Sequence, residues 1–345
     1  MKRINKYISL TLLLITVALA VGCNKVQIET DSDGKHLMDF SVASVDSKAL
    51  VDDVTDIDAF NVYGYYTYDG STIEKPFDNV SVSRLDGYMN ETEAARYWEY
   101  DAKYSFAAFY NPSQASIMIE DFGLDSDGKF APFSFTYEKK DFYDDFMLAV
   151  RSITTEEAAS TDYKVPLVFQ HILSNIHFNI DFNSVQNGTY IRIKSVSLSG
   201  MKRSAKFTYN QGWTNHSTAA LQLSQSGLDL IIYKNGGKVY QNGEILAGGI
   251  LSPTGTEGIT VIPVDLSNYN NVVTLRLQCD ISTDAQTWTQ KSIEKTLNAG
   301  VIQEWEPGCV YTYTANLSVD YSINFSEPSV KDWIDEQATG SVIIK

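Results

Sequence analysis

The residues that could do chemistry match no catalytic motif. The 345-residue sequence holds 3 Cys, 4 His and 43 acidic residues. It contains no G-x-S-x-G nucleophile motif, no H-E-x-x-H zinc motif, no paired C-x-x-C and no glycine-rich phosphate loop. Two carboxylates could form a glycosidase pair, but separation in space decides this and spacing along the chain does not give it. We therefore expect a protein that is not an enzyme.

Histidines and a repeated acidic turn are the candidates for metal binding. His171 and His177 lie in the segment FQHILSNIHFNI, where apolar residues alternate with His177. This alternation puts His177 on the polar face of a strand, as a solvated side chain. The motif DSDGK occurs at 31–35 and 125–129 but lacks the third acidic ligand and the closing Glu of a calcium loop. We expect turns there, no metal and no cofactor.

Cys23 is the one cysteine inside a recognisable motif. The apolar run Tyr7–Gly22 follows three basic residues and is shorter than the ~20 residues that span a membrane, which is typical of a signal peptide. Its end, AVGC, resembles the lipobox, which is cut between Gly22 and Cys23, immediately N-terminal to the cysteine that receives a diacylglycerol. Several acyl chains give stable membrane anchoring. The alternative is an ordinary secreted protein in which Cys23 is incidental.

Charge and length limit the partners and the domain number. The sequence has 27 basic and 43 acidic residues, a formal net charge of −16, and no basic block in the mature chain. Such a surface disfavours nucleic acid and anionic lipid as partners. The chain is long enough for two domains of ordinary size.

Alternating apolar residues predict an all-β chain. The 21 Tyr and 16 Phe favour strands. In 311–325 every second residue is apolar, but one strand of this length would run ~50 Å, so a bend near Asp320 or a continuation across two sheets is expected. In IRIKSVSLSG the apolar parity changes, which predicts a β-bulge near Lys194 and Ser195.

Composition along the chain suggests four segments. Residues 1–22 are the signal peptide, and the Asp- and Ser-rich residues 23–36 form a lipidated tether. A polar stretch, RSITTEEAASTDYK, separates two strand-rich regions. We therefore expect an N-terminal domain over 37–160 and a C-terminal domain over 161–345.

Cys279 and Cys309 both fall on the apolar parity of predicted strands. Both thiols are therefore expected in a core. The cell envelope permits a disulfide between them, but sequence does not show that the two Cα atoms come within bonding distance. A bridge and two buried free thiols both remain open.

The order of these features resembles a known family. After the lipobox come HLMDFSVAS, FNVYGYY, DFMLAV, VPLVFQHILSNIHFNI and finally WEPGCVYTYTANLSVDYSINF with VKDWID. This order is similar to that of the fimbrillin-like (Mfa-like) proteins, the lipoprotein precursors of type V pili and their relatives. The resemblance implies two tandem β-sandwich domains of transthyretin-like topology, surface-exposed on the outer membrane.

The resemblance also implies a mechanism of assembly. In pilus-forming members a trypsin-like protease cuts after the first strand, and the C-terminal strand of a neighbouring subunit fills the vacated groove. Here Lys48 stands where the resemblance leads us to expect Arg, and the first arginine after the signal peptide is Arg84.

The C-terminus bears on the role in a pilus. The segment ATGSVIIK, 338–345, lacks the long alternating run that a donor strand needs. A minor or anchor-like subunit, or a stand-alone surface protein, therefore fits better than a stalk subunit, with other fimbrillin-type subunits and host ligands as partners. The alternative is a surface glycan-binding lipoprotein associated with polysaccharide uptake, with stacking platforms among five tryptophans: Trp98, Trp213, Trp288, Trp305 and Trp333.

Replacing Cys23 tests the anchor. Because the acyl chains would be the hydrophobic attachment, Cys23→Ala should move the protein from the membrane fraction to the soluble fraction. Labelled palmitate should enter the wild type and not the variant. A variant that stays on the membrane, with no label in the wild type, would refute the lipid anchor.

Overall fold

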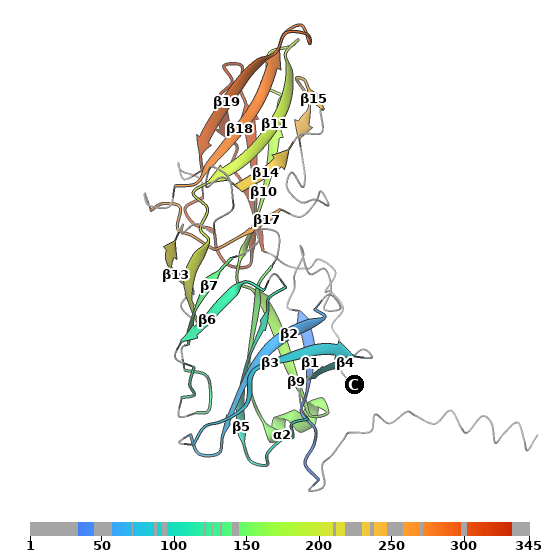
Figure 1. Ribbon diagram of the computed structural model, residues 1–345, viewed down its shortest axis with the longest axis vertical. Helices are drawn as coiled ribbons and strands as arrows, with labels where there is room; N and C mark the ends of the chain where they lie inside the picture. Colours follow the sequence, from blue (N-terminus) through green and yellow to red (C-terminus); the bar gives the residue numbers. More distant parts are fainter. Residues whose placement is uncertain are drawn as a thin grey trace, which may run out of the picture.

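The computed structural model shows an elongated, almost entirely β protein (Figure 1). Residues are described in these ranges: 34–44, 57–70, 72–85, 88–91, 95–112, 114–120, 122–125, 127–131, 133–139, 145–209, 212–217, 230–234, 238–246, 258–268, 272–297 and 302–332. Within these ranges no helix is long and apolar enough to cross a membrane. The prediction of an all-β fold is confirmed.

The N-terminal half is built around a closed barrel. Its strands follow the order β1-β4-β3-β2-β5-β8-β9. Their bounds are β1 Asp39–Ser44, β2 Ala59–Thr67, β3 Glu74–Leu85, β4 Tyr88–Glu91, β5 Lys103–Tyr110, β8 Met147–Thr154 and β9 Lys164–His171. Alternate residues of β2 point inward, which gives the interior its aromatic core.

The connection between β8 and β9 carries the short helical segments α2, Thr155–Ala158, and η2, Ala159–Thr161. A capping box starts α2: the Glu157 backbone N–H donates to the Thr154 hydroxyl, and the Glu157 carboxylate accepts from the Thr154 backbone N–H. Asp162 then takes a left-handed conformation that ends the turn. The sequence pair Thr154 and Glu157 therefore sets where β8 stops.

A second, four-stranded sheet covers part of the barrel. It has the order β13-β12-β7-β6, with bounds β6 Ser116–Glu120, β7 Ser134–Glu138, β12 Ser204–Thr208 and β13 Gly212–Ser217. We call it the covering sheet. An aromatic cluster fills the space between the covering sheet and the outer face of β2, β5 and β8, with Phe109, Phe135 and Phe146 in edge or stacked contact.

The distal half packs two sheets face to face. One has the order β16-β10-β20-β21 with β17 beside β10 and β22 beside β20, and the other the order β14-β11-β18-β19 with β15 beside β11. Their bounds are β10 Ser174–Asp181, β11 Tyr190–Ser199, β14 Leu230–Lys234, β15 Val239–Tyr240, β16 Ile245–Leu246, β17 Ile259–Val261, β18 Thr274–Ser282, β19 Thr289–Thr296, β20 Cys309–Leu317, β21 Ile323–Phe325 and β22 Ser329–Asp332. One apolar cluster joins the sheets.

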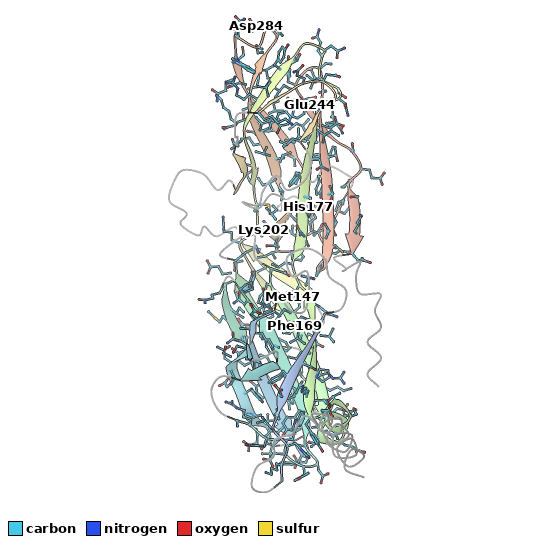
Figure 2. The ribbon with its side chains drawn as sticks, turned by 90° about the vertical axis from the view of Figure 1, so that its right-hand side faces the viewer. Met147, Phe169, His177, Lys202, Glu244 and Asp284 are labelled. Carbon is cyan, nitrogen blue, oxygen red and sulfur yellow. The ribbon has the colours of Figure 1, made fainter. Side chains whose placement is uncertain are left out.

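The N-terminal half and the distal half lie end to end along the long axis of the molecule. Met147 and Phe169 lie in the barrel, while Glu244 and Asp284 lie toward the far end of the distal half (Figure 2). Ile172 and Leu173 separate β9 from β10, and both are buried in the cluster that the covering sheet shares with the barrel. A buried two-residue connection restricts bending at this point.

Strand pairs cross the position where the sequence suggested a domain boundary. β9 follows residue 160 but pairs with β8 and β1, and β12 pairs with β7. The division into 37–160 and 161–345 stays a prediction, and any boundary has to keep these pairs together. Two local predictions are confirmed: the register of β11 against β18 shifts between Ile193 and Ser195, and the segment 311–325 turns between β20 and β21.

Gly64 gives a test of barrel packing. A Cβ on Gly64 would stand 2.8 Å from ring atoms of both Phe77 and Phe106. Gly64→Ala should therefore lower the free energy of unfolding by about 1–3 kcal/mol, through overpacking. Urea unfolding followed by tryptophan fluorescence measures this. Gly123→Ala is the matched control, since nothing lies within 4 Å of its added Cβ, and equal stability loss in both variants would contradict the packing argument.

Candidate functional site

The strand β1 closes the barrel by pairing with strands that are far away in sequence. On one side it runs parallel to β9, from Asp39 opposite Lys164 to Ser44 opposite Phe169. On the other side it is antiparallel to β4, with Phe40 opposite Met89. Removing β1 would leave two facing strand edges with unpaired backbone groups, the kind of edge that recruits another strand.

Alternate side chains of β1 enter the barrel core. Met38, just before the strand, and Phe40 are buried, and Val42 packs against the same cluster. The Phe40 ring makes edge contacts with Phe60 and Phe106, with centroids 5.9 and 5.7 Å apart. We call the space that β1 fills between β4 and β9 the slot. It offers backbone hydrogen-bond partners along both edges, and aromatic side chains of the barrel core line its inner side.

The outward residues of β1 are only half covered. Asp39 sits opposite Lys164 at the start of the parallel pairing. Burial raises the pKa of Asp39, against the opposing effects of the Phe40 backbone N–H and the Lys164 ammonium. The carboxylate accepts from that N–H at 2.7 Å.

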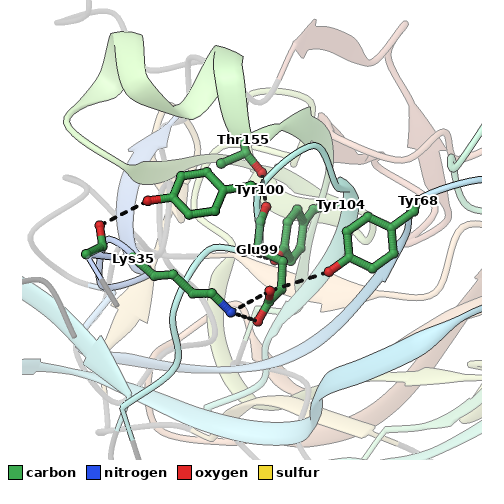
Figure 3. Close-up of polar contacts among 7 residues, drawn as sticks. Lys35, Tyr68, Glu99, Tyr100, Tyr104 and Thr155 are labelled. Carbon is green, nitrogen blue, oxygen red and sulfur yellow. Dashed lines mark hydrogen bonds and ion pairs between the residues drawn. The ribbon is translucent and has the colours of Figure 1, made fainter. Parts of the chain in front are cut away.

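Glu99 binds the chain just before β1 (Figure 3). Its carboxylate pairs with the Lys35 ammonium at 2.6 Å and accepts from the Tyr68 hydroxyl at 3.4 Å. Its backbone N–H donates to the Tyr104 hydroxyl, and its backbone carbonyl accepts from Thr155 at 2.6 Å. Buried neighbours thus hold Glu99 in place, although a half-exposed ion pair itself contributes only about 0–1 kcal/mol.

Further contacts extend this attachment. The His36 and Tyr163 rings stack with centroids 3.5 Å apart, and the Tyr100 hydroxyl donates to the Gly34 carbonyl at 3.2 Å. The Trp98 backbone N–H donates to the His36 carbonyl at 2.9 Å. We call residues 34–38 the latch segment. It lies in sequence before the strand and would have to be released together with it.

The other residues predicted for processing lie outside the described residues. These are Gly22 and Cys23 at the expected lipidation site, and Lys48 in the stretch between β1 and β2. The lipid anchor and the cut after the first strand therefore stay predictions.

The two core cysteines are free thiols in the structure, and both are buried. Cys279 lies on β18 and Cys309 starts β20, in opposite sheets of the distal half. Burial raises the pKa of Cys279 to about 12 and also raises that of Cys309. The structure thus has two buried free thiols, one of the two alternatives that the sequence left open.

His177 lies on the predicted face of its strand but is less exposed than expected. His177 is only half exposed, and burial lowers its pKa, so the prediction of a solvated side chain is wrong. A neighbouring loop causes this, since a Cβ at Gly258 would stand 2.7 Å from His177 Nε2. His171 is buried, with Nδ1 2.5 Å from Asp145 Oδ2. Among the described residues no group of His, Cys, Asp or Glu is placed to hold a metal ion.

The second DSDGK motif forms the turn that the sequence predicted. Asp125 Oδ1 accepts from the backbone N–H groups of Asp127 and Lys129, which confirms a turn at 125–129.

Two of the five tryptophans are excluded as stacking platforms, because Trp98 and Trp305 are 1% exposed and cannot stack on a ligand. Arg192 lies 4.0 Å over the Trp288 ring. Trp213 lies on β13 and Trp333 outside the described residues.

Comparison with known proteins identifies the family of this β protein. A family model described as fimbrillin-like matches residues 47–333. The chain therefore belongs to the fimbrillin-like family, as the order of its sequence features predicted. A comparison with curated proteins gives no match.

One solved structure supports the fold, and a second is reported for comparison. The chain is 15% identical to a fimbrial protein from Bacteroides vulgatus, with a TM-score of 0.59 over 86% of this chain and 99% of that one. A fimbrial assembly protein from Parabacteroides distasonis is 10% identical, with a TM-score of 0.39 over 86% and 99% of the two chains.

Proposed function

We propose that this protein is a fimbrial subunit, assembled by strand exchange, in which β1 is the strand that leaves. It would be exported as an outer-membrane lipoprotein attached through Cys23, and its partners would be other fimbrillin-type subunits. Membership of the fimbrillin-like family supports the fimbrial role. The observation that carries strand exchange is the slot of β1, which pairs on both edges with strands distant in sequence.

The slot meets the physical requirements of strand addition. An incoming strand gains backbone hydrogen bonds from the β9 and β4 edges, and pockets for alternate side chains give specificity. Here the pockets are those that Met38 and Phe40 fill. An empty slot would expose the aromatic floor and the strand edges, so the cut subunit would have to recruit a strand or aggregate.

The residue at the expected cut favours an accessory or anchor role. Lys48 follows β1 by four residues. An Arg-specific protease recognises the bidentate guanidinium fork, which the compact lysine ammonium lacks. An uncut chain keeps both β1 and the lipid on Cys23. It would then stay at the membrane and end or anchor a fimbria, which fits the short apolar segment at 338–345.

Substitution at Lys48 tests this role. Purified wild type should stay whole and monomeric with an Arg-specific protease, whereas Lys48→Arg should be cut and form SDS-resistant ladders when β1 leaves. N-terminal sequencing should place the cut after residue 48. Lys48→Gln is the control, and should resist Arg-specific and Lys-specific proteases alike at this position.

Two results would count against the proposal. Efficient cutting of the wild type after Lys48, with ladders, would make the chain a stalk subunit and remove the anchor-like role. A cut Lys48→Arg protein that loses residues 34–44 and yet remains monomeric and soluble would contradict strand exchange itself.

A further inference from the structure

A pocket with an amide rim opens beside the barrel, away from the slot of β1. Its volume is about 240 Å³, and it lies where the outer face of β2, β3 and β5 meets β6, the edge strand of the covering sheet. Phe109, Ile117 and Ile119 line its apolar part. The aromatic cluster under the covering sheet therefore reaches the surface here.

Uncharged amides surround this apolar floor. Asn61, Asn79 and Gln114 line the pocket, from β2, β3 and the turn before β6. The Asn61 amide N–H donates to the Asn79 backbone carbonyl at 3.4 Å, which leaves its Oδ1 as an acceptor. Within the described part of the chain, the side chains of Asn79 and Gln114 make no hydrogen bond. Each offers a donor and an acceptor to a ligand.

The backbone is shaped to place these two amides. The register of β2 against β3 shifts between Val62 and Gly64, a bulge that contains Asn79. Asn79 has φ 58° and Gln114 has φ 50°, both in the left-handed region. Left-handed conformations are uncommon for residues other than glycine, and bulges redirect side chains near functional sites. Asn111 fixes the turn that carries Gln114. Its side-chain N–H donates to the Ala115 carbonyl, and its side-chain oxygen accepts from the Ala115 N–H.

An aromatic ring completes the wall. Tyr63 lines the pocket and is half-buried. Its ring stacks on Phe122, with centroids 5.1 Å apart, and is perpendicular to the Phe109 ring, with centroids 5.9 Å apart. These contacts hold the ring rigidly. A rigid aromatic wall among free amides suits a ligand that carries both C–H surface and hydroxyl groups.

Charge disfavours an anionic ligand. None of the described residues that line the pocket is charged. Burial raises the pKa of Tyr63, and the carboxylate of Asp78, beside Asn79, raises it further. Asp78 thus places a negative charge near Tyr63, and the whole chain carries a formal net charge of −16. An anionic ligand would be repelled.

We propose that this pocket binds one neutral sugar unit of a glycan. The amides of Asn79, Gln114 and Asn61 exchange hydrogen bonds with its hydroxyls, and Tyr63 packs against its C–H face. The volume lies below the ~300–1,000 Å³ typical of sites for drug-sized ligands, which fits one ring at the end of a glycan and not a longer stretch. The site is independent of strand exchange, because none of its residues belongs to β1.

Saturation-transfer NMR on the uncut full chain tests the proposal. The probes are the methyl glycosides of glucose, galactose, mannose and N-acetylglucosamine, with sialic acid as the anionic comparison. At least one neutral glycoside should bind, and sialic acid should bind more weakly. Asn79→Gly and Gln114→Gly remove one amide each while glycine accepts the positive φ. Each should weaken binding by about tenfold, the loss expected for a hydrogen bond between neutral groups.

A matched control separates the pocket from general effects. Ala285→Gly changes an exposed residue with φ 58° in the β18–β19 turn, and should leave binding unchanged. Absence of binding by every neutral glycoside would overturn the proposal. Binding that survives both pocket substitutions would also overturn it, because the sugar would then sit elsewhere. Because the protein is uncut, none of these results depends on whether subunits exchange strands.

Discussion

The backbone pairing of β1 with β9 and β4 is the interaction on which the barrel depends. A backbone N–H or C=O group that is buried without a hydrogen-bond partner costs about 1–3 kcal/mol of stability. No hairpin joins β1 to either partner, so pairing on both edges and the buried Phe40 together hold it. No tight turn joins β1 to its partners. A second strand with the same alternation of apolar residues could therefore take its place.

The latch segment gives this strand a second attachment. Glu99 is fixed by Tyr104 and Thr155, and it binds Lys35 beyond the end of the slot. Cutting after β1 alone would not free the strand, since the stacked His36 and Tyr163 rings also hold the preceding residues. In the proposed exchange, cleavage and departure would therefore be separate steps. In the proposed exchange, an incoming strand would have to displace both β1 and the latch segment.

Sequence alternation predicted much of this architecture because burial on one face forces a period of two. It placed the turn after β20, where Asp320 accepts from Ser322 and Ser318, and the bulge between Ile193 and Ser195. It did not predict the parallel pairing of β1 with β9. Such a pairing depends on which distant edges meet, and neither strand carries a local signal of its partner.

The site residues were predictable to a different extent. Lys48 and Cys23 follow from motifs and order, whereas the amide pocket brings Asn61, Asn79 and Gln114 together from separate elements. Asn79 had no sequence signal, because a bulge within β3 determines where its side chain lies. Trp305 could not be told from a stacking platform by sequence alone: it donates to the Tyr313 hydroxyl at 2.9 Å inside the distal core, where its bulk stabilises packing.

Locking β1 in its slot tests the central claim most directly. Asp39 and Lys164 lie opposite each other, so Asp39→Cys with Lys164→Cys, in a chain that also carries Lys48→Arg, allows a reducible cross-link whose formation mass spectrometry can verify. After cutting with an Arg-specific protease, the cross-linked protein should stay monomeric, and reduction of the bond should start ladder formation. Ladders of equal extent before and after reduction would show that subunits assemble with β1 still in place, and would contradict the account.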